Sequence, residues 1–287
     1  MWDITTHYNK EYTIMKHCPI ILSIAGSDCS GGAGIQADIK TISALGGYAA
    51  SVITAVTSQN TLGVQGVYTL PPEVVAQQIR SVMSDLKPHA VKIGMVAHEK
   101  IVQVIADCLD EFKPKHVVYD PVMVSTSGRK LMTDEAIRTI RKELFPRATL
   151  ITPNLDEVSL LTGRPIHTTS EMVSAGLKFA QLWHTALLVK GGHLEGDKMT
   201  DVLCTEQGES FHFESSKIAS SNLHGTGCTL SSAIAAHLAM HYDLRQAVEL
   251  GKSYVSRAIE AGADLEIGSG NGPLCHFFSP FPTLLTD

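Results

Sequence analysis

The chain has 287 residues, of which 44% are apolar, and a formal net charge of −6 from 23 basic and 29 acidic residues. This length allows one large α/β domain or two smaller ones with a sizeable core. The acidic balance, without a basic run, argues against a nucleic-acid-binding surface or a polybasic membrane contact. No apolar run reaches the roughly 18 residues of a membrane span.

Six cysteines and 13 histidines are scattered without C-x-x-C or H-E-x-x-H spacing. This predicts neither a zinc site nor a disulfide framework, and a reducing, cytoplasmic location fits. The N-terminus carries no apolar segment with a cleavage site of the secretory type. Residues 1–16 are polar and have no clear period, so we expect a disordered extension that precedes an alternative start at Met15.

From residue 17 onward, short apolar runs alternate with amphipathic stretches. The predicted strands are 20–24, 49–57, 90–93, 116–119, 149–151, 186–190 and, more weakly, 199–204. The predicted helices are 35–45, 72–86, 99–112, 134–145, 155–162, 170–183, 230–241 and 244–261. Such alternation predicts βαβ units and a mostly parallel sheet covered on both faces. Because no Pro-, Gly- or Ser-rich linker divides residues 17–287, we expect one α/β domain.

Polar and glycine clusters follow the predicted strands. They comprise residues 25–34, 58–60, 94–95, 120–123, 152–157 and 190–193. In open parallel sheets, ligands bind beyond the carboxyl ends of the strands. Six such clusters along one edge therefore predict a ligand-binding edge.

The first cluster contains G-x-G-x-x-A at 32–37, a pattern typical of dinucleotide-binding loops. However, Gly26 is expected to end the preceding strand six residues earlier, and no acidic residue near 55 could hold a ribose. The Gly-Lys-Ser/Thr of a Walker A loop is also missing from it. The cluster is either a flexible loop or the backbone wall of a small-molecule pocket.

The most informative segment is His-Gly-Thr-Gly-Cys-Thr-Leu at 224–230, followed by a helical pattern. Gly225 and Gly227 let the backbone approach a ligand closely. The free N–H groups of the helix start favour an anion, and their field is expected to lower the pKa of the Cys228 thiol. An anion cradle that contains a potential base suggests phosphoryl transfer. The alternative is an ordinary loop-to-helix turn with a buried cysteine.

Other polar residues fit this chemistry but have ordinary alternatives. Asp120 and Glu157, at neighbouring strand ends, could anchor magnesium or merely cap the following turns. Asp38 could be a common acidic residue early in a helix. Lys190 and Gln59 could be solvated, and Met95 could belong to the core. His193 and His224 are expected to be structural or to face solvent.

Several motifs together carry a family resemblance. They are AGSDCSGGAGIQAD at 25–38, VITA at 52–55 with QN at 59–60, KIGM at 92–95, DPVM at 120–123, TPNLDE at 152–157, VKGGH at 189–193 and HGTGCTLS at 224–231. In this order they resemble the hydroxymethylpyrimidine/phosphomethylpyrimidine kinases of thiamine biosynthesis, over roughly residues 19–265. The resemblance implies the three-layer ribokinase-like fold, ATP as co-substrate, a small-molecule substrate, Mg²⁺ and a homodimer.

The resemblance also implies residue roles. The anion hole would be formed by Gly225, Thr226 and Gly227, and the base that deprotonates the substrate alcohol would be Cys228. The pyrimidine edge would be bound by Asp38 and Gln59, and the ring pocket lined by Gly26, Met95 and Val122. Nucleotide phosphates would be contacted by Asn154 and Lys190. Magnesium would be held, mostly through water, by Asp120 and Glu157.

Two alternatives stay open. The first is a pyridoxal/pyridoxine kinase of the same superfamily, whose two-cysteine branch has its second cysteine in the loop after Asp-Pro-Val-Met-Val. Ser125 occupies that place here and favours the pyrimidine substrate. The second is a metabolite-sensing module without catalysis, against which the intact Gly225, Gly227 and Cys228 argue.

Overall fold

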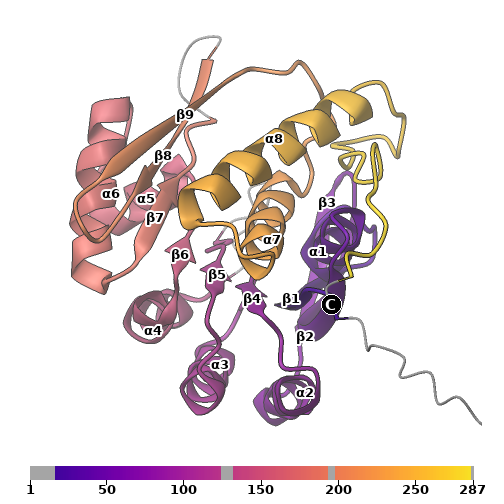
Figure 1. Ribbon diagram of the computed structural model, residues 1–287, viewed down its shortest axis with the longest axis vertical. Helices are drawn as coiled ribbons and strands as arrows, with labels where there is room; N and C mark the ends of the chain where they lie inside the picture. Colours follow the sequence, from indigo (N-terminus) through magenta and orange to yellow (C-terminus); the bar gives the residue numbers. More distant parts are fainter. Residues whose placement is uncertain (1–16, 124–131, 193–197, 286–287) are drawn as a thin grey trace, which may run out of the picture.

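A computed structural model of the chain describes residues 17–123, 132–192 and 198–285. The sheet in these residues has the strand order β3-β2-β1-β4-β5-β6-β7-β8-β9 (Figure 1). The strands are β1 (Ile20–Asp28), β2 (Tyr48–Asn60), β3 (Gly63–Thr69), β4 (Ala90–Ile93), β5 (Val117–Tyr119), β6 (Leu150–Ile151), β7 (Ala186–Val189), β8 (Lys198–Cys204) and β9 (Ser210–Ser216). Neighbours from β2 to β7 are parallel, whereas the pairs β2–β3, β7–β8 and β8–β9 are antiparallel.

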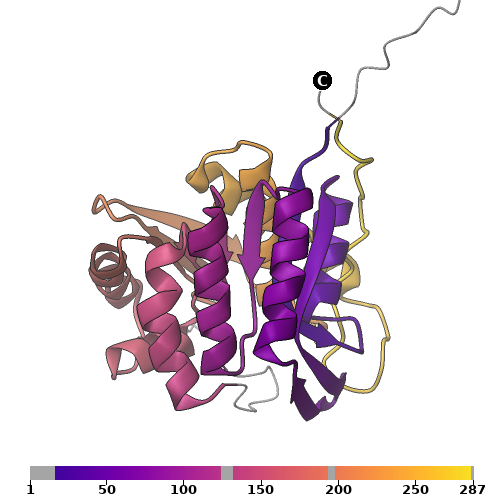
Figure 2. The same cartoon turned by 90° about the horizontal axis from the view of Figure 1, so that it is seen from below.

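Helices cover both faces of this sheet. One face carries α1 (Gly34–Ala44), α7 (Thr226–Ala239) and α8 (Leu244–Gly262). The other carries α2 (Pro72–Asp85), α3 (Glu99–Phe112), α4 (Asp134–Glu143), α5 (Leu155–Thr162) and α6 (Thr169–Trp183), and Figure 2 shows the first three of these side by side. The apolar strands are buried on both sides between two hydrophobic clusters. The predicted α/β fold with a mostly parallel, doubly covered sheet is confirmed.

Three sequence predictions about the elements were wrong. The edge strands β3 and β9 were missed, because neither has a buried residue and both mix half-buried with exposed side chains. Strand β1 does not end at Gly26 but continues to Asp28, with a register shift against β2 between Ala25 and Ser27. Helix α7 begins at Thr226, four residues before its predicted start.

Some predictions fall on residues outside the described ranges, namely those for residues 1–16, Ser125 and His193. Within the part of the chain that the structure describes, no helix has the length and apolar character to cross a membrane.

A buried ion pair fastens α7 to the sheet. The Lys92 ammonium of β4 lies 2.9 and 2.8 Å from the two carboxylate oxygens of Asp38 in α1, and both side chains are 0% exposed. Ser23 of β1 and Ser232 of α7 donate hydroxyl hydrogen bonds to the same carboxylate. Burial by itself would lower the pKa of Lys92, but attraction to Asp38 outweighs it and raises that pKa. Four elements therefore meet at one fully paired charge cluster.

Removing one partner of this pair should be costly, because an uncompensated charge would stay buried. We expect Lys92→Met to lower the free energy of unfolding by about 3–5 kcal/mol, measured by urea denaturation near neutral pH. The matched control is Lys178→Met on the exposed side of α6, which should change stability by less than about 0.5 kcal/mol. An equal effect of the two substitutions would contradict a structural role for the pair.

Candidate active site

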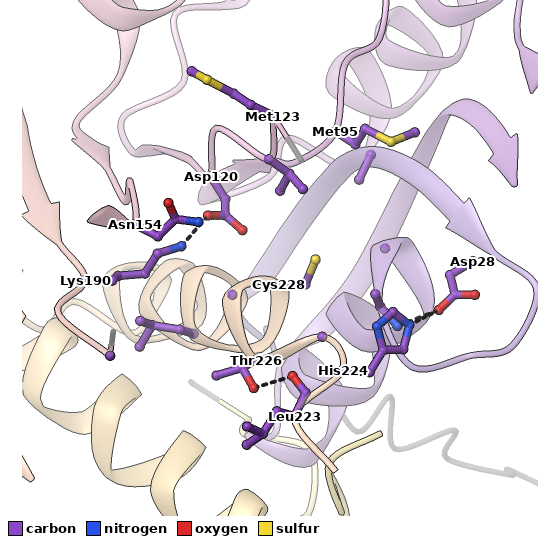
Figure 3. Close-up of a pocket in the computed structure, with 18 of the residues that line it drawn as sticks. Asp28, Met95, Asp120, Met123, Asn154, Lys190, Leu223, His224, Thr226 and Cys228 are labelled. Carbon is purple, nitrogen blue, oxygen red and sulfur yellow. Dashed lines mark hydrogen bonds and ion pairs between the residues drawn. The ribbon is translucent and has the colours of Figure 1, made fainter. Parts of the chain in front are cut away.

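A cavity of about 850 Å³ opens at the carboxyl ends of the parallel strands, where the polar clusters were predicted to meet (Figure 3). The sequence-predicted residues that line it are Gly26, Gln59, Met95, Asp120, Val122, Asn154, Glu157, Lys190, Gly225, Thr226, Gly227 and Cys228. These residues come from seven separate segments of the chain, so the fold brings together nearly the whole predicted site.

The start of α7 forms one wall of the cavity. Gly225 has a φ of +86°, and a Cβ there would collide with the carbonyl oxygen of Gly32. A Cβ at Gly227 would come within 3.3 Å of the Asp120 carboxylate and 3.4 Å of the Lys190 ammonium. Glycine is therefore needed at 225, and a side chain at 227 would crowd the Asp120–Lys190 pair. The Thr226 N–H donates to the Leu223 carbonyl oxygen, but the positive end of the helix dipole still gives the cavity an anion-binding end.

Cys228 occupies the first turn of α7, and its thiol faces the cavity in Figure 3. Burial raises the pKa of this thiol to about 11, Lys92 opposes the rise, and Asp38 and Asp120 add to it. The sequence had predicted a lowered pKa from the helix start. That prediction was wrong in direction, because removal from water and two carboxylates outweigh the favourable field.

Asp120 and Lys190 face each other across the ends of β5 and β7. The Lys190 ammonium lies 3.0 Å from Asp120 Oδ1, to which the Thr152 hydroxyl also donates. Asp120 Oδ2 is buried and has no hydrogen-bond partner among the described residues. A buried carboxylate oxygen without a partner is unfavourable, so a cation or a water-borne hydrogen bond there would be stabilising.

Glu157 and Asn154 form the capping box of α5. Glu157 Oε2 accepts the backbone N–H of Asn154 at 2.7 Å, and the Asn154 side-chain oxygen accepts that of Glu157 at 2.9 Å. Glu157 Oε1 accepts the N–H of Met123. The capping bond leaves the side-chain nitrogen of Asn154 as the group that can donate to an anion.

Burial raises the pKa of Glu157 from 4.5 to about 7, with Lys190 opposing and Asp120 adding to the rise. A divalent cation near Asp120 and Glu157 would favour both ionised carboxylates. No group of three or more His, Cys, Asp or Glu side chains in the described residues forms a ready metal cage. Two carboxylates fit Mg²⁺ in particular, because this ion keeps several waters and binds nucleotide phosphates.

Asp38 does not line the cavity and is fully buried, so its predicted contact with the substrate was wrong. Both of its oxygens are occupied by the buried bonds to Lys92, Ser23 and Ser232. The sequence placed Asp38 correctly at the start of a helix. The lysine that takes up its carboxylate lies 54 residues away.

His224 and Asp28 were missed as site residues. His224 was expected to be structural or solvent-facing, yet it lines the cavity and is 8% exposed. Its Nε2 lies 2.9 Å from Asp28 Oδ2 and 3.0 Å from the Gln59 amide (Figure 3 draws the bond to Asp28). Asp28 precedes a serine-glycine run, a pattern typical of a carboxylate that caps its own turn. That local signal would have identified Asp28 but not His224.

The Asp28 carboxylate organises the glycine-rich loop. It accepts the backbone N–H groups of Ser30, Gly32 and Ala33 and the Ser30 hydroxyl. Burial would raise the pKa of Asp28, but the bonds from His224, Ser30 and the loop backbone lower it to about 2. The loop is therefore a wall built around an ionised carboxylate, one of the two readings that the sequence left open.

Comparison with known proteins identifies the family of this chain. The family model described as Phosphomethylpyrimidine kinase matches residues 28–275. The chain belongs to this family. It is 49% identical over 260 residues to hydroxymethylpyrimidine/phosphomethylpyrimidine kinase of Rhizobium meliloti (strain 1021), covering 90% of this chain and 97% of that protein.

Two solved structures of this kinase fold are similar as well. Phosphomethylpyrimidine kinase from Clostridium difficile 630 matches with a TM-score of 0.74 and 44% identity, over 84% of this chain and 99% of that one. An ADP complex of Bacillus subtilis pyridoxal kinase matches with a TM-score of 0.83 and 32% identity, over 91% and 98%. The predicted family and the ribokinase-like fold are confirmed.

The raised pKa of Glu157 makes the stability of the ligand-free protein depend on pH. Because the folded-state pKa lies above 4.5, the contribution of this group is present below about pH 4.5 and lost as pH rises through about 7. We expect Glu157→Gln, which can keep the capping bond, to gain about 3 kcal/mol relative to wild type between about pH 4 and 8. Denaturant unfolding in EDTA measures this gain.

The matched control is Glu171→Gln. Glu171 holds the same capping-box place in α6, but backbone hydrogen bonds lower its pKa. It should show no gain at high pH. A pH-independent difference between Glu157→Gln and wild type would contradict a raised pKa of Glu157.

Proposed function

We propose that this chain transfers the terminal phosphoryl group of ATP to 4-amino-5-hydroxymethyl-2-methylpyrimidine and then to its monophosphate, in thiamine biosynthesis. The observation that carries the proposal is a single cavity with two unlike ends. One end combines the N-terminus of α7 with Lys190 and two carboxylates, and the other offers the Gln59 amide beside Gly26 and Met95. Membership of the family supports the same reaction.

The first end suits the nucleotide. Lys190, the side-chain nitrogen of Asn154 and the N–H groups of α7 can bind phosphate oxygens. Asp120 and Glu157 would hold Mg²⁺ through water, and the ion would neutralise charge on the transferring group. Apolar side chains of Met199, Ile218 and Leu223 also line the cavity and can pack against a nucleobase.

The second end suits a small aromatic ring. A Cβ at Gly26 would lie 2.7 Å from the Met95 methyl carbon, so glycine at this position lets the Met95 side chain pack directly against the backbone. Val122 lies on the same cavity. Gln59 supplies an amide for the polar ring edge. The monophosphate would then present a phosphate oxygen where the alcohol stood in the first step.

Phosphoryl transfer depends mainly on alignment and charge neutralisation. Of the predicted anion hole, Gly225 and Gly227 would offer backbone N–H groups to the charge that develops on the transferring phosphoryl group. The Thr226 N–H already donates to the Leu223 carbonyl oxygen and would have to exchange that partner. Cys228 is the base that takes the proton from the substrate alcohol.

We further propose a cytoplasmic homodimer. The edge strand β3 exposes Tyr68, and Val56 and Leu62 are exposed on the neighbouring strand and turn. An apolar edge of this kind invites pairing, and a second copy would cover it.

A kinase assay with purified protein on hydroxymethylpyrimidine, its monophosphate and pyridoxal tests the function. We expect kcat/KM for hydroxymethylpyrimidine to exceed that for pyridoxal by at least about tenfold, or about 1.4 kcal/mol in the transition state. Equal or reversed values would favour a pyridoxal kinase. ATP turnover with none of the three substrates would reject the proposed function.

Substitution of Cys228 tests the base. Cys228→Ala should lower kcat by a factor on the order of 10²–10⁴ and leave the affinity for ATP nearly unchanged. Because the pKa of the Cys228 thiol is about 11, wild-type turnover should rise between about pH 7 and 9 as the thiolate fraction grows. Cys228→Asp should retain part of the activity without that rise. Near-normal turnover by a folded Ala variant would remove Cys228 from the mechanism.

A further inference from the structure

The Gln59 amide lies between two hydrogen-bonding neighbours. As placed, the amide nitrogen lies 3.0 Å from His224 Nε2, and the amide oxygen lies 3.2 Å from the Thr57 hydroxyl. The oxygen and nitrogen ends of an amide have nearly the same shape, so the hydrogens of the neighbours decide which end points where.

The Asp28 carboxylate determines whether Nε2 of His224 carries a hydrogen. The Asp28 carboxylate already accepts the bonds from its own loop, and hydrogen bonds hold its pKa at about 2, so it is ionised and has no hydrogen to give. It lies 2.9 Å from His224 Nε2. A ring nitrogen that faces a carboxylate at this distance must carry the hydrogen, because two lone pairs would otherwise repel each other.

A protonated Nε2 cannot accept a hydrogen bond from the amide of Gln59. It can share its hydrogen between Asp28 Oδ2 and an oxygen of Gln59, as a three-centre bond. The end of the Gln59 amide that faces His224 is therefore the oxygen, Oε1.

The hydrogen bonds of the Thr57 hydroxyl independently indicate the same orientation of the Gln59 amide. Its hydroxyl has one hydrogen and lies 3.0 Å from the carbonyl oxygen of Ser27, a group that can only accept. If that hydrogen goes to Ser27, the Thr57 oxygen can accept only from the Gln59 nitrogen. One continuous chain then satisfies every group, from Gln59 Nε2–H to Thr57 and from Thr57 to Ser27.

We propose that His224, held by Asp28, is a positioning residue that turns the Gln59 amide with its oxygen toward His224 and its nitrogen toward Thr57. The amide then shows the cavity one acceptor lone pair on the His224 side and one N–H donor on the Thr57 side. This pair complements a ring nitrogen next to an exocyclic amino group. The substrate part of this inference rests on the proposed function, whereas the hydrogen positions do not.

The kinetic test compares hydroxymethylpyrimidine with its analogue that lacks the 4-amino group. In wild type, kcat/KM should favour the amino compound, because an unmade hydrogen bond leaves the amide unpaired. His224→Phe keeps a ring but removes the donor, and should lower this ratio by about tenfold. The KM for ATP should stay within about twofold of wild type, because the nucleotide contacts are separate.

His237→Phe is the matched control, because His237 is 9% exposed, close to the 8% of His224, and lies at the far end of α7. It should leave the substrate ratio unchanged even if stability falls. Thr57→Val is the second variant and should lower the ratio as well, even if His224→Phe does not fold. A fall in kcat/KM that is equal for both substrates, or an unchanged ratio in these variants, would overturn the positioning role.

The hydrogen on His224 can be measured without any substrate. Nitrogen-15 NMR of the wild-type protein should show His224 Nε2 bonded to hydrogen near neutral pH, with its signal assigned by loss in His224→Phe. A bare Nε2 would overturn the inference whatever the enzyme phosphorylates. If Nε2 carries the hydrogen but no pyrimidine is phosphorylated, the proposed function fails and the amide orientation stands.

Discussion

The start of α7 has to approach two other segments at contact distance, and the geometry of the cavity depends on this. At Gly225 any side chain would strike the Gly32 carbonyl, and at Gly227 it would crowd the Asp120–Lys190 pair. With glycine at both positions, no side chain stands between the first turn of α7 and the Asp120–Lys190 pair at the ends of β5 and β7. The anion-binding end therefore follows from a packing constraint that two glycines satisfy.

The buried Asp38–Lys92 pair helps to hold α7 in this position against the sheet. It connects β1, α1, β4 and α7 without any exposure to water. The two charges of the pair act in opposite directions on Cys228, because Lys92 lowers the pKa of the thiol and Asp38 raises it. Burial is the largest influence on the pKa of Cys228. A prediction based only on the field of the helix start therefore had the wrong direction.

Sequence patterns predicted what depends on local chemistry. The run at 90–93 is apolar apart from Lys92 because β4 is buried on both faces, and it was located correctly. The half-exposed edge strand β9 carries no such signal. Likewise, strand-end polar clusters located the cavity, but partners distant in the chain decided individual roles. Asp38 is neutralised by a lysine 54 residues away, and His224 meets Asp28 across 196 residues. Residue chemistry alone suggested phosphoryl transfer, whereas the family motifs indicated the class of substrate as well.

Burial is the common cause of three unusual features of the site: two raised pKa values and one carboxylate oxygen without a hydrogen-bond partner in the described residues. Burial raises the pKa of Glu157 to about 7, raises that of Cys228 to about 11 and leaves Asp120 Oδ2 without a partner in the described residues. A cation beside the two carboxylates would favour their ionised forms and displace the proton that Glu157 holds near neutral pH. Cation binding and proton release at Glu157 are then two sides of one linked equilibrium. The proposed magnesium nucleotide would thus be bound more tightly as pH rises through 7, in the same range in which the ligand-free fold loses stability.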